Sequence, residues 1–199
     1  LSATLPMDIV PTFLGAHGWA EGKSKEWYID QLCQEMIPQV AAFHMASFND
    51  VWVDEGNYTS AEAERILTCG VDHGLIPSIH ADCYSDIGAT ALAAQMKMAN
   101  AGHLNYTPLS VMPKLRDAGV VGVILPGTDF VVRHPRVADA RPMLQCGMTM
   151  AIATNCNPGC WMESMQVALA LACRKLVHDG VLEKNPIRHY VTGVSAGIV

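Results

Sequence analysis

Several polar residues of this sequence stand where an apolar, strand-like run ends. His17 follows one such run, His80 ends a second and His103 lies in a short third one, and Asn155 comes directly after the run Met150–Thr154. In an α/β barrel, the polar groups at the carboxyl ends of the strands form the site. Imidazoles that converge there are good ligands for a borderline divalent metal ion, which can activate water. The sequence therefore predicts a metal-assisted hydrolytic site, in which Asn155 stands where such chemistry usually uses a carboxylate.

Each of these histidines also has a simpler interpretation. A lone histidine at a strand end is more often a hydrogen-bonded structural residue than a ligand, but three at separate strand ends favour a functional role. The other histidines lie on predicted helices or loops and are expected to be solvated. The charged segment that contains Asp129, Arg133 and Arg136 is predicted to be a solvated loop. A flap that brings Arg133 to an anionic substrate is the alternative.

The elements that must position these residues alternate between strand and helix. The predicted strands are Met7–Ala16, Asp50–Asp54, Ile76–His80, Ala101–Asn105, Val120–Leu125 and Met148–Thr154. The predicted helices are Ser24–Ala46, Thr59–Gly70, Gly88–Asn100, Pro108–Ala118, Val137–Cys146 and Glu163–His178. Most of the strands are continuous apolar runs, which indicates a parallel sheet covered on both faces. These six units fit either a (β/α)8 barrel that lacks two units or an open, doubly wound sheet.

Composition limits the class of protein. The chain has 199 residues, of which 50% are hydrophobic and 16% charged, and its net charge is −6. This composition predicts one globular domain and excludes the basic surface that nucleic acids or anionic membranes require. From these residues we expect neither a signal peptide nor a membrane span. Seven irregularly spaced cysteines favour reduced thiols, and therefore a cytoplasmic protein.

Five short motifs together resemble those of the imidazolonepropionase family of the amidohydrolase superfamily. They are VPTFLGAH, IHAD, GHL, VILPG and AIATNCNPG, and they occur in the family's order with similar spacing. The resemblance implies an α/β fold, the (β/α)8 barrel of the metal-dependent amidohydrolase type, here incomplete with about six βα units. Residues 1–199 are then expected to form a single partial barrel domain, a fragment that lacks the N-terminal part.

The resemblance also implies an activity and a set of site residues. The family hydrolyses the cyclic C–N bond of 4-imidazolone-5-propanoate to N-formimidoyl-L-glutamate in histidine degradation, with one Zn²⁺ or Fe ion. The matching positions make His80 and Asn155 metal ligands. They give Asp82 and His103 roles in proton transfer. They place His17, Asn157 and Gly159 in the substrate site. The expected partner is a small-molecule substrate, and a homodimer is a possible assembly.

The sequence departs from the family pattern in three ways. It has no H-x-H, which supplies two ligands in the family; Asn155 replaces an aspartate; and Asp82 is shorter than the usual glutamate, with Gly102 replacing an acid before His103. These departures predict impaired activity for this chain. The alternatives are a non-catalytic small-molecule binding domain derived from an amidohydrolase and an open-sheet α/β domain that is similar only in fold.

Overall fold

The computed structural model describes residue 4 and residues 8–178. Their centre is a six-stranded sheet in which the strands follow the order of the chain, and every neighbouring pair is parallel. The strands are β1 (Thr12–Ala16), β2 (Phe48–Val53), β3 (Ile76–Ala81), β4 (Asn100–His103), β5 (Val121–Ile124) and β6 (Met150–Ile152). An unbroken sequential order confirms the partial barrel and rules out a doubly wound sheet, in which the order reverses.

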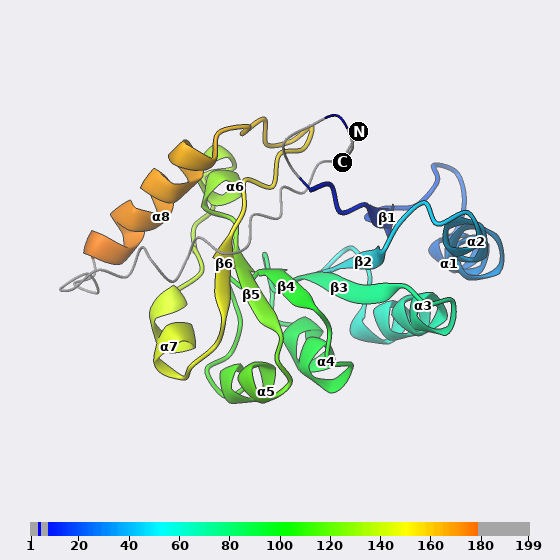
Figure 1. Ribbon diagram of the computed structural model, residues 1–199, viewed down its shortest axis with the longest axis horizontal. Helices are drawn as coiled ribbons and strands as arrows, with labels where there is room; N and C mark the ends of the chain where they lie inside the picture. The colour runs from blue at the N-terminus through cyan, green and yellow to red at the C-terminus, as the bar shows by residue number, and fades with distance from the viewer. Residues whose placement is uncertain (1–3, 5–7, 179–199) are drawn as a thin grey trace.

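Helices connect successive strands and cover the sheet. They are α1 (Lys25–Gln31), α2 (Ile37–Ala42), α3 (Ser60–Asp72), α4 (Ala89–Gln95), α5 (Met112–Asp117), α6 (Pro126–Val131), α7 (Ala140–Gln145) and α8 (Met165–His178), with a π-helical turn η1 (Leu32–Met36) between α1 and α2. Figure 1 shows α3, α4, α5 and α7 along the outer side of the curved sheet. Within the described residues, no helix is long and apolar enough to cross a membrane.

The main core lies between the sheet and these helices. Ile79 of β3, Ile66 of α3 and Leu115 of α5 are fully buried there. A second, smaller cluster of Val123, Leu125, Ala151 and Ala153 contains the alternate residues of the chain through β5 and β6. Because successive side chains of a strand point to opposite faces, this cluster lies on the inner face of the sheet. The inner face also carries the polar residues described below.

Proline explains two of the differences from the predicted boundaries. The first strand begins at Thr12, directly after Pro11, which has no N–H to give to a ladder; the predicted start at Met7 lies outside the described residues. The predicted helix Ser24–Ala46 is divided by η1 and ends at Ala42, and Pro38 stands in the first turn of α2. A proline is tolerated in a first turn, where its missing N–H would have no partner.

The prediction for the segment after β5 was wrong. The sequence predicted a solvated loop there, whereas the structure has the helix α6 with Pro126 as its first residue. Asp129 of this helix is buried, and its Oδ1 accepts a hydrogen bond of 2.9 Å from Asn105 Nδ2. The prediction was wrong because a Pro-Gly pair suggests a turn, although proline also fits the first position of a helix. Arg133 and Arg136 follow the helix and are exposed, as expected.

Candidate functional site

Three histidines meet at one end of the sheet. The rings of His17 and His80 have their centroids 4.5 Å apart in an edge-to-face arrangement, and those of His80 and His103 are 5.4 Å apart. His17 follows β1, His80 is the last residue but one of β3, and His103 is the last residue of β4, so parallel neighbouring strands bring them to the same rim. The structure therefore confirms that the three imidazoles converge.

A fourth residue, Asp50, joins two of these imidazoles. Its Oδ1 lies 2.7 Å from Nε2 of His17 and 2.7 Å from Nδ1 of His80, and its Oδ2 accepts a hydrogen bond of 2.7 Å from the Ser78 hydroxyl. Asp50 pairs with Ser78 in the sheet register and is 3% exposed. Asp50 was not among the predicted site residues, because those stand at the carboxyl ends of strands and Asp50 stands at the start of the predicted strand Asp50–Asp54. A charged residue at the start of this apolar run was the available signal.

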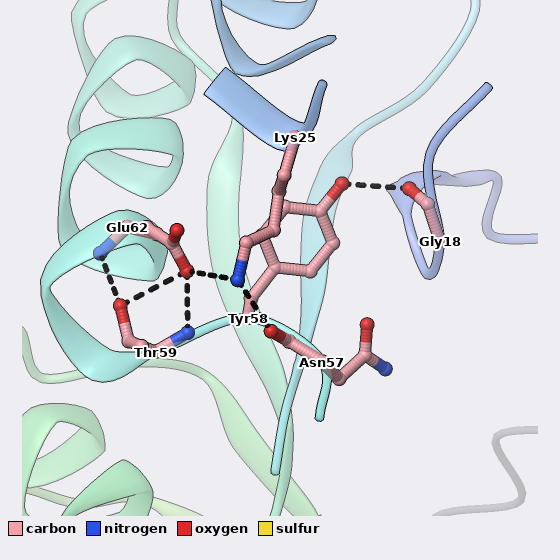
Figure 2. Close-up of polar contacts among 6 residues, drawn as sticks. All are labelled: Gly18, Lys25, Asn57, Tyr58, Thr59 and Glu62. Carbon is pink, nitrogen blue, oxygen red and sulfur yellow. Dashed lines mark hydrogen bonds and ion pairs between the residues drawn. The ribbon is translucent and has the colours of Figure 1, made fainter. Parts of the chain in front are cut away.

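The loop that carries His17 is held in place from the adjacent unit. The hydroxyl of Tyr58 donates a hydrogen bond of 2.6 Å to the carbonyl of Gly18, the residue after His17. Burial raises the pKa of Tyr58, so this donor stays protonated. Figure 2 shows Lys25 beside it, with Nζ 2.8 Å from the Asn57 carbonyl and 3.0 Å from the Glu62 carboxylate. These contacts tie the start of α1 to the start of α3 and fix the position of His17.

The charges in the cluster are set by burial and by Asp50. Burial opposes ionisation of Asp50, but the charge on His80 and hydrogen bonds from both histidines hold the pKa of its carboxyl well below the ordinary range. Burial also lowers the pKa of His80, yet Asp50 and a hydrogen bond with the Asn155 side chain raise it above the ordinary value. For His17, burial and the neighbouring His80 charge leave the pKa lowered. The cluster therefore favours one charged imidazole paired with one carboxylate.

His103 is the imidazole of the group whose pKa is lowered most clearly. Burial, followed by the charge on His80, lowers its pKa to about 3. Its Nδ1 is buried and has no hydrogen-bond partner among the described residues. The residue also has φ of 72°, in the left-handed region. Such a conformation costs about 1–3 kcal/mol in a non-glycine residue and is common at functional sites. A neutral imidazole with an unused buried nitrogen can accept a proton or bind a metal ion.

Asn155 enters the site from the end of β6. Its side chain forms the hydrogen bond with His80 noted above, and its Nδ2 donates a bond of 2.9 Å to the Thr128 hydroxyl. With Nδ2 used in this way, the amide oxygen is the atom that faces the imidazole. Its φ is 52°, which asparagine tolerates better than most residues. Sequence reasoning placed this residue beside His80, and the structure brings the two together.

Asn157 and Gly159 form a tight turn beyond Asn155. Oδ1 of Asn157 accepts hydrogen bonds from the N–H groups of Gly159 and Cys160, at 2.8 and 3.1 Å, and its Nδ2 donates to the Asn155 carbonyl at 2.7 Å. A Cβ at Gly159 would come within 3.3 Å of Asn157 Oδ1, which favours glycine there. The hydrogen bonds of Asn157 are therefore made within this turn and to Asn155. The predicted contact of Asn157 and Gly159 with substrate stays a prediction.

Asp82 takes a different direction from the histidines. Its Oδ2 accepts hydrogen bonds from the hydroxyls of Thr90 and Thr107, at 2.6 and 3.0 Å, and its Oδ1 has no partner among the described residues. Burial raises its pKa to about 6. The structure does not record a contact between Asp82 and His80 or His103. Its predicted role in proton transfer therefore stays a prediction, while its contacts connect α4 to the segment after β4.

The donor atoms suit a divalent metal ion. His17, Asp50 and His80 each offer a ligand atom, and these atoms lie within 4.8 Å of one another. The unpartnered Nδ1 of His103 and the amide oxygen of Asn155 add further donors beside His80. Imidazole nitrogen and carboxylate oxygen are the usual protein ligands of zinc, and imidazole also suits iron. The residues present therefore fit the kind of ion that the sequence predicted.

Comparison with curated proteins identifies relatives over most of this chain. The imidazolonepropionase of Geobacillus thermodenitrificans is 40% identical over 178 residues, which are 87% of this chain and 41% of that protein. The imidazolonepropionase of Syntrophobacter fumaroxidans is 40% identical over 170 residues, or 84% of this chain and 40% of that protein. The chain thus spans about two fifths of the length of these relatives. No protein-family model matches it.

Solved structures with a similar fold are more distant in sequence. An adenosine deaminase from Xanthomonas campestris with bound zinc has a TM-score of 0.63 at 13% identity, covering 86% of this chain and 43% of that one. A guanine deaminase from C. acetobutylicum with bound guanine also has a TM-score of 0.63, at 8% identity, covering 87% of this chain and 46% of that one. These likenesses concern the fold alone. In sequence, over most of its own length, the chain is similar to imidazolonepropionases.

Proposed function

We propose that this chain forms the greater part of a metal-dependent hydrolase site that opens the ring of 4-imidazolone-5-propanoate to N-formimidoyl-L-glutamate. The observation that carries the proposal is the convergence of His17, His80 and His103 at one rim, with Asn155 beside His80. The chain matches about two fifths of the length of its relatives, so we propose their activity for it on the strength of this site. The proposed setting is the cytoplasm, as part of histidine degradation.

The residues of the chain have separate tasks in this reaction. His80 and Asn155 would hold the Zn²⁺ or Fe ion, which supplies an acidified water and polarises the ring carbonyl. Hydrolysis adds the water oxygen to the carbonyl carbon, breaks the ring C–N bond and moves a proton to the leaving nitrogen. We assign to His103 the transfer of the water proton to that nitrogen, because its Nδ1 is buried and has no hydrogen-bond partner among the described residues. His17 would orient the substrate beside His80.

The test is hydrolysis of 4-imidazolone-5-propanoate by the purified chain after chelation and after addition of Zn²⁺ or Fe²⁺. We expect turnover only with the metal, and a loss of about 10²–10⁴-fold in His103→Asn. His73→Ala is the matched control, since His73 is exposed and bonds only within its own helix and that helix's end. The proposal would be overturned if the turnover of the unmodified chain did not respond to chelation. It would also be overturned if His103→Asn turned over as fast as the unmodified chain.

A second candidate follows from Asn155. An amide oxygen is neutral and cannot accept a proton as a carboxylate does, and the sequence has no H-x-H. These two features favour a non-catalytic domain that binds the same small molecule. Calorimetric binding of the substrate without any turnover, in the presence of metal, would favour this candidate over the hydrolase.

A further inference from the structure

One buried carboxylate oxygen serves two imidazoles of the site. Asp50 Oδ1 lies 2.7 Å from a nitrogen of His17 and 2.7 Å from a nitrogen of His80. An ionised carboxylate only accepts hydrogen bonds, so both imidazole nitrogens must carry the proton. The other oxygen, Oδ2, accepts from Ser78, which prevents the carboxylate from turning. Asp50 thus keeps a proton on Nε2 of His17 and on Nδ1 of His80.

The choice of nitrogen decides which atom of His80 faces the site. Nδ1 of His80 bonds to Asp50, and the remaining nitrogen of the ring is Nε2. The ring also has a hydrogen bond with Asn155, which therefore falls to Nε2. Metal-binding histidines almost always donate their other N–H to a carboxylate or carbonyl, which fixes the tautomer and the ring orientation. His17 is held through Nε2, which leaves Nδ1 as its unused nitrogen.

We propose that Asp50 is a positioning residue, which holds the Nδ1–H of His80 so that Nε2 meets the metal beside Asn155, and which holds His17 next to the same ring. The part of this inference that concerns the metal rests on the proposed function. The hold on the two imidazoles rests on geometry alone. Although Asp50 could offer an oxygen to a metal ion, both of its oxygens are already engaged by His17, His80 and Ser78, so we assign it a role that acts through the histidines.

A purely structural role explains Asp50 poorly. Val51 and Val53 alternate with Asp50 along β2 and pack into the main core, so Asp50 faces the opposite, inner side of the sheet. A buried carboxylate at the centre of a strand costs free energy that an apolar residue would not. Asp54, four residues later and equally buried, bonds instead to the N–H groups of Glu55 and Tyr84 and to the Ser85 hydroxyl. Asp54 stabilises a loop and touches no histidine among the described contacts.

The experiment is long-range ¹H–¹⁵N NMR of the histidine rings in the chain and in two variants. The unmodified chain should show an Nδ1-bound proton on His80, shifted downfield by its hydrogen bond to a carboxylate. Asp50→Asn should lose this signal and change the signals of His17, whereas the matched control Asp54→Asn should keep both. Zn²⁺ affinity, measured by competition with a chelating dye, should fall about 10- to 100-fold in Asp50→Asn and stay unchanged in Asp54→Asn.

The two readouts separate this inference from the proposed function. If the NMR signals change as expected but no variant binds Zn²⁺, the proposed function fails and the hold of Asp50 on the imidazoles stands. If His80 in the unmodified chain carries its proton only on Nε2, the inference is overturned whatever the metal does. That measurement needs no variant, so it decides the question even if Asp50→Asn does not fold.

Discussion

Asn155 stands where the family pattern has an aspartate, so the site has an amide of nearly the same shape in place of a negative charge. Its oxygen faces His80, and its Nδ2 donates to the Thr128 hydroxyl, which can itself donate to a carboxylate. We predict that Asn155→Asp folds normally and binds Zn²⁺ at least about tenfold more tightly, because the ligand gains a negative charge. Dye competition measures the affinity. Asn100→Asp, at the opposite end of the sheet, is the control, and equal affinities of Asn155→Asp and the unmodified chain would contradict the assignment.

Asp82 gives a prediction about pH. Burial raises its pKa to about 6, so the folded state binds its proton more tightly than the unfolded state does. The resulting stabilisation is complete below pH 4 and is lost as the pH rises through 6. It amounts to about 3 kcal/mol between these limits. The Asp82→Asn variant should lack this loss, so urea denaturation at pH 4 and pH 7 should show a smaller decrease in stability for the variant. Parallel pH profiles for the two proteins would refute it.

Among single residues, the sequence predicted those site residues that stand near the end of an apolar run. His17, His80 and His103 could be predicted because each stands in or directly after such a run. Asp50 could not be found in this way, since it lies within a strand and its partners come from two other strands. The direction of Asp82 toward Thr90 and Thr107 was likewise not predictable, because it depends on how α4 packs beside β4.

Among the helices, α3 begins with a capping box that was predicted from the sequence. Thr59 Oγ1 accepts a hydrogen bond from the Glu62 N–H, and the Glu62 carboxylate accepts one from the Thr59 N–H, as the predicted capping box requires. We predict that Thr59→Ala lowers the free energy of unfolding by about 1 kcal/mol. Thermal denaturation measures it. Thr68→Ala, at an exposed position in the same helix, is the control and should be neutral or slightly stabilising, since alanine favours helix; an equal effect of both would count against the capping role.

The strands were easier to predict than the helices that join them. Buried parallel strands are short apolar runs, and all six were found, with ends displaced by a few residues. Short helices carry weaker signals. The helix α4 ends at Gln95, five residues before the predicted end, because the chain turns through Lys97 with φ of 50° to begin β4. The helix α6 was missed because Pro126 and Gly127 together suggest a turn.

For the whole molecule, the order of strands predicts behaviour in solution. The outer strands β1 and β6 each have one neighbour within the described sheet, and Ile9 and Val10 before β1 are 40% and 60% exposed. Unpaired apolar edges favour pairing with another chain. We predict concentration-dependent association of the purified chain, visible in size-exclusion chromatography with light scattering. A heat-resistant monomer at all concentrations would contradict this, and Val10→Lys should weaken association if the β1 edge takes part.

The central claim concerns the site as a unit: three imidazoles converge at one rim of a partial barrel, and His80 among them is a ligand of the metal ion. Co²⁺ binding tests it most directly, because the visible absorption of bound Co²⁺ reports the coordination geometry. We predict that the chain and its His73→Ala variant give the same absorption bands with one Co²⁺ per chain, and that His80→Ala abolishes them. Bands that are unchanged in His80→Ala, or that disappear in His73→Ala, would contradict it.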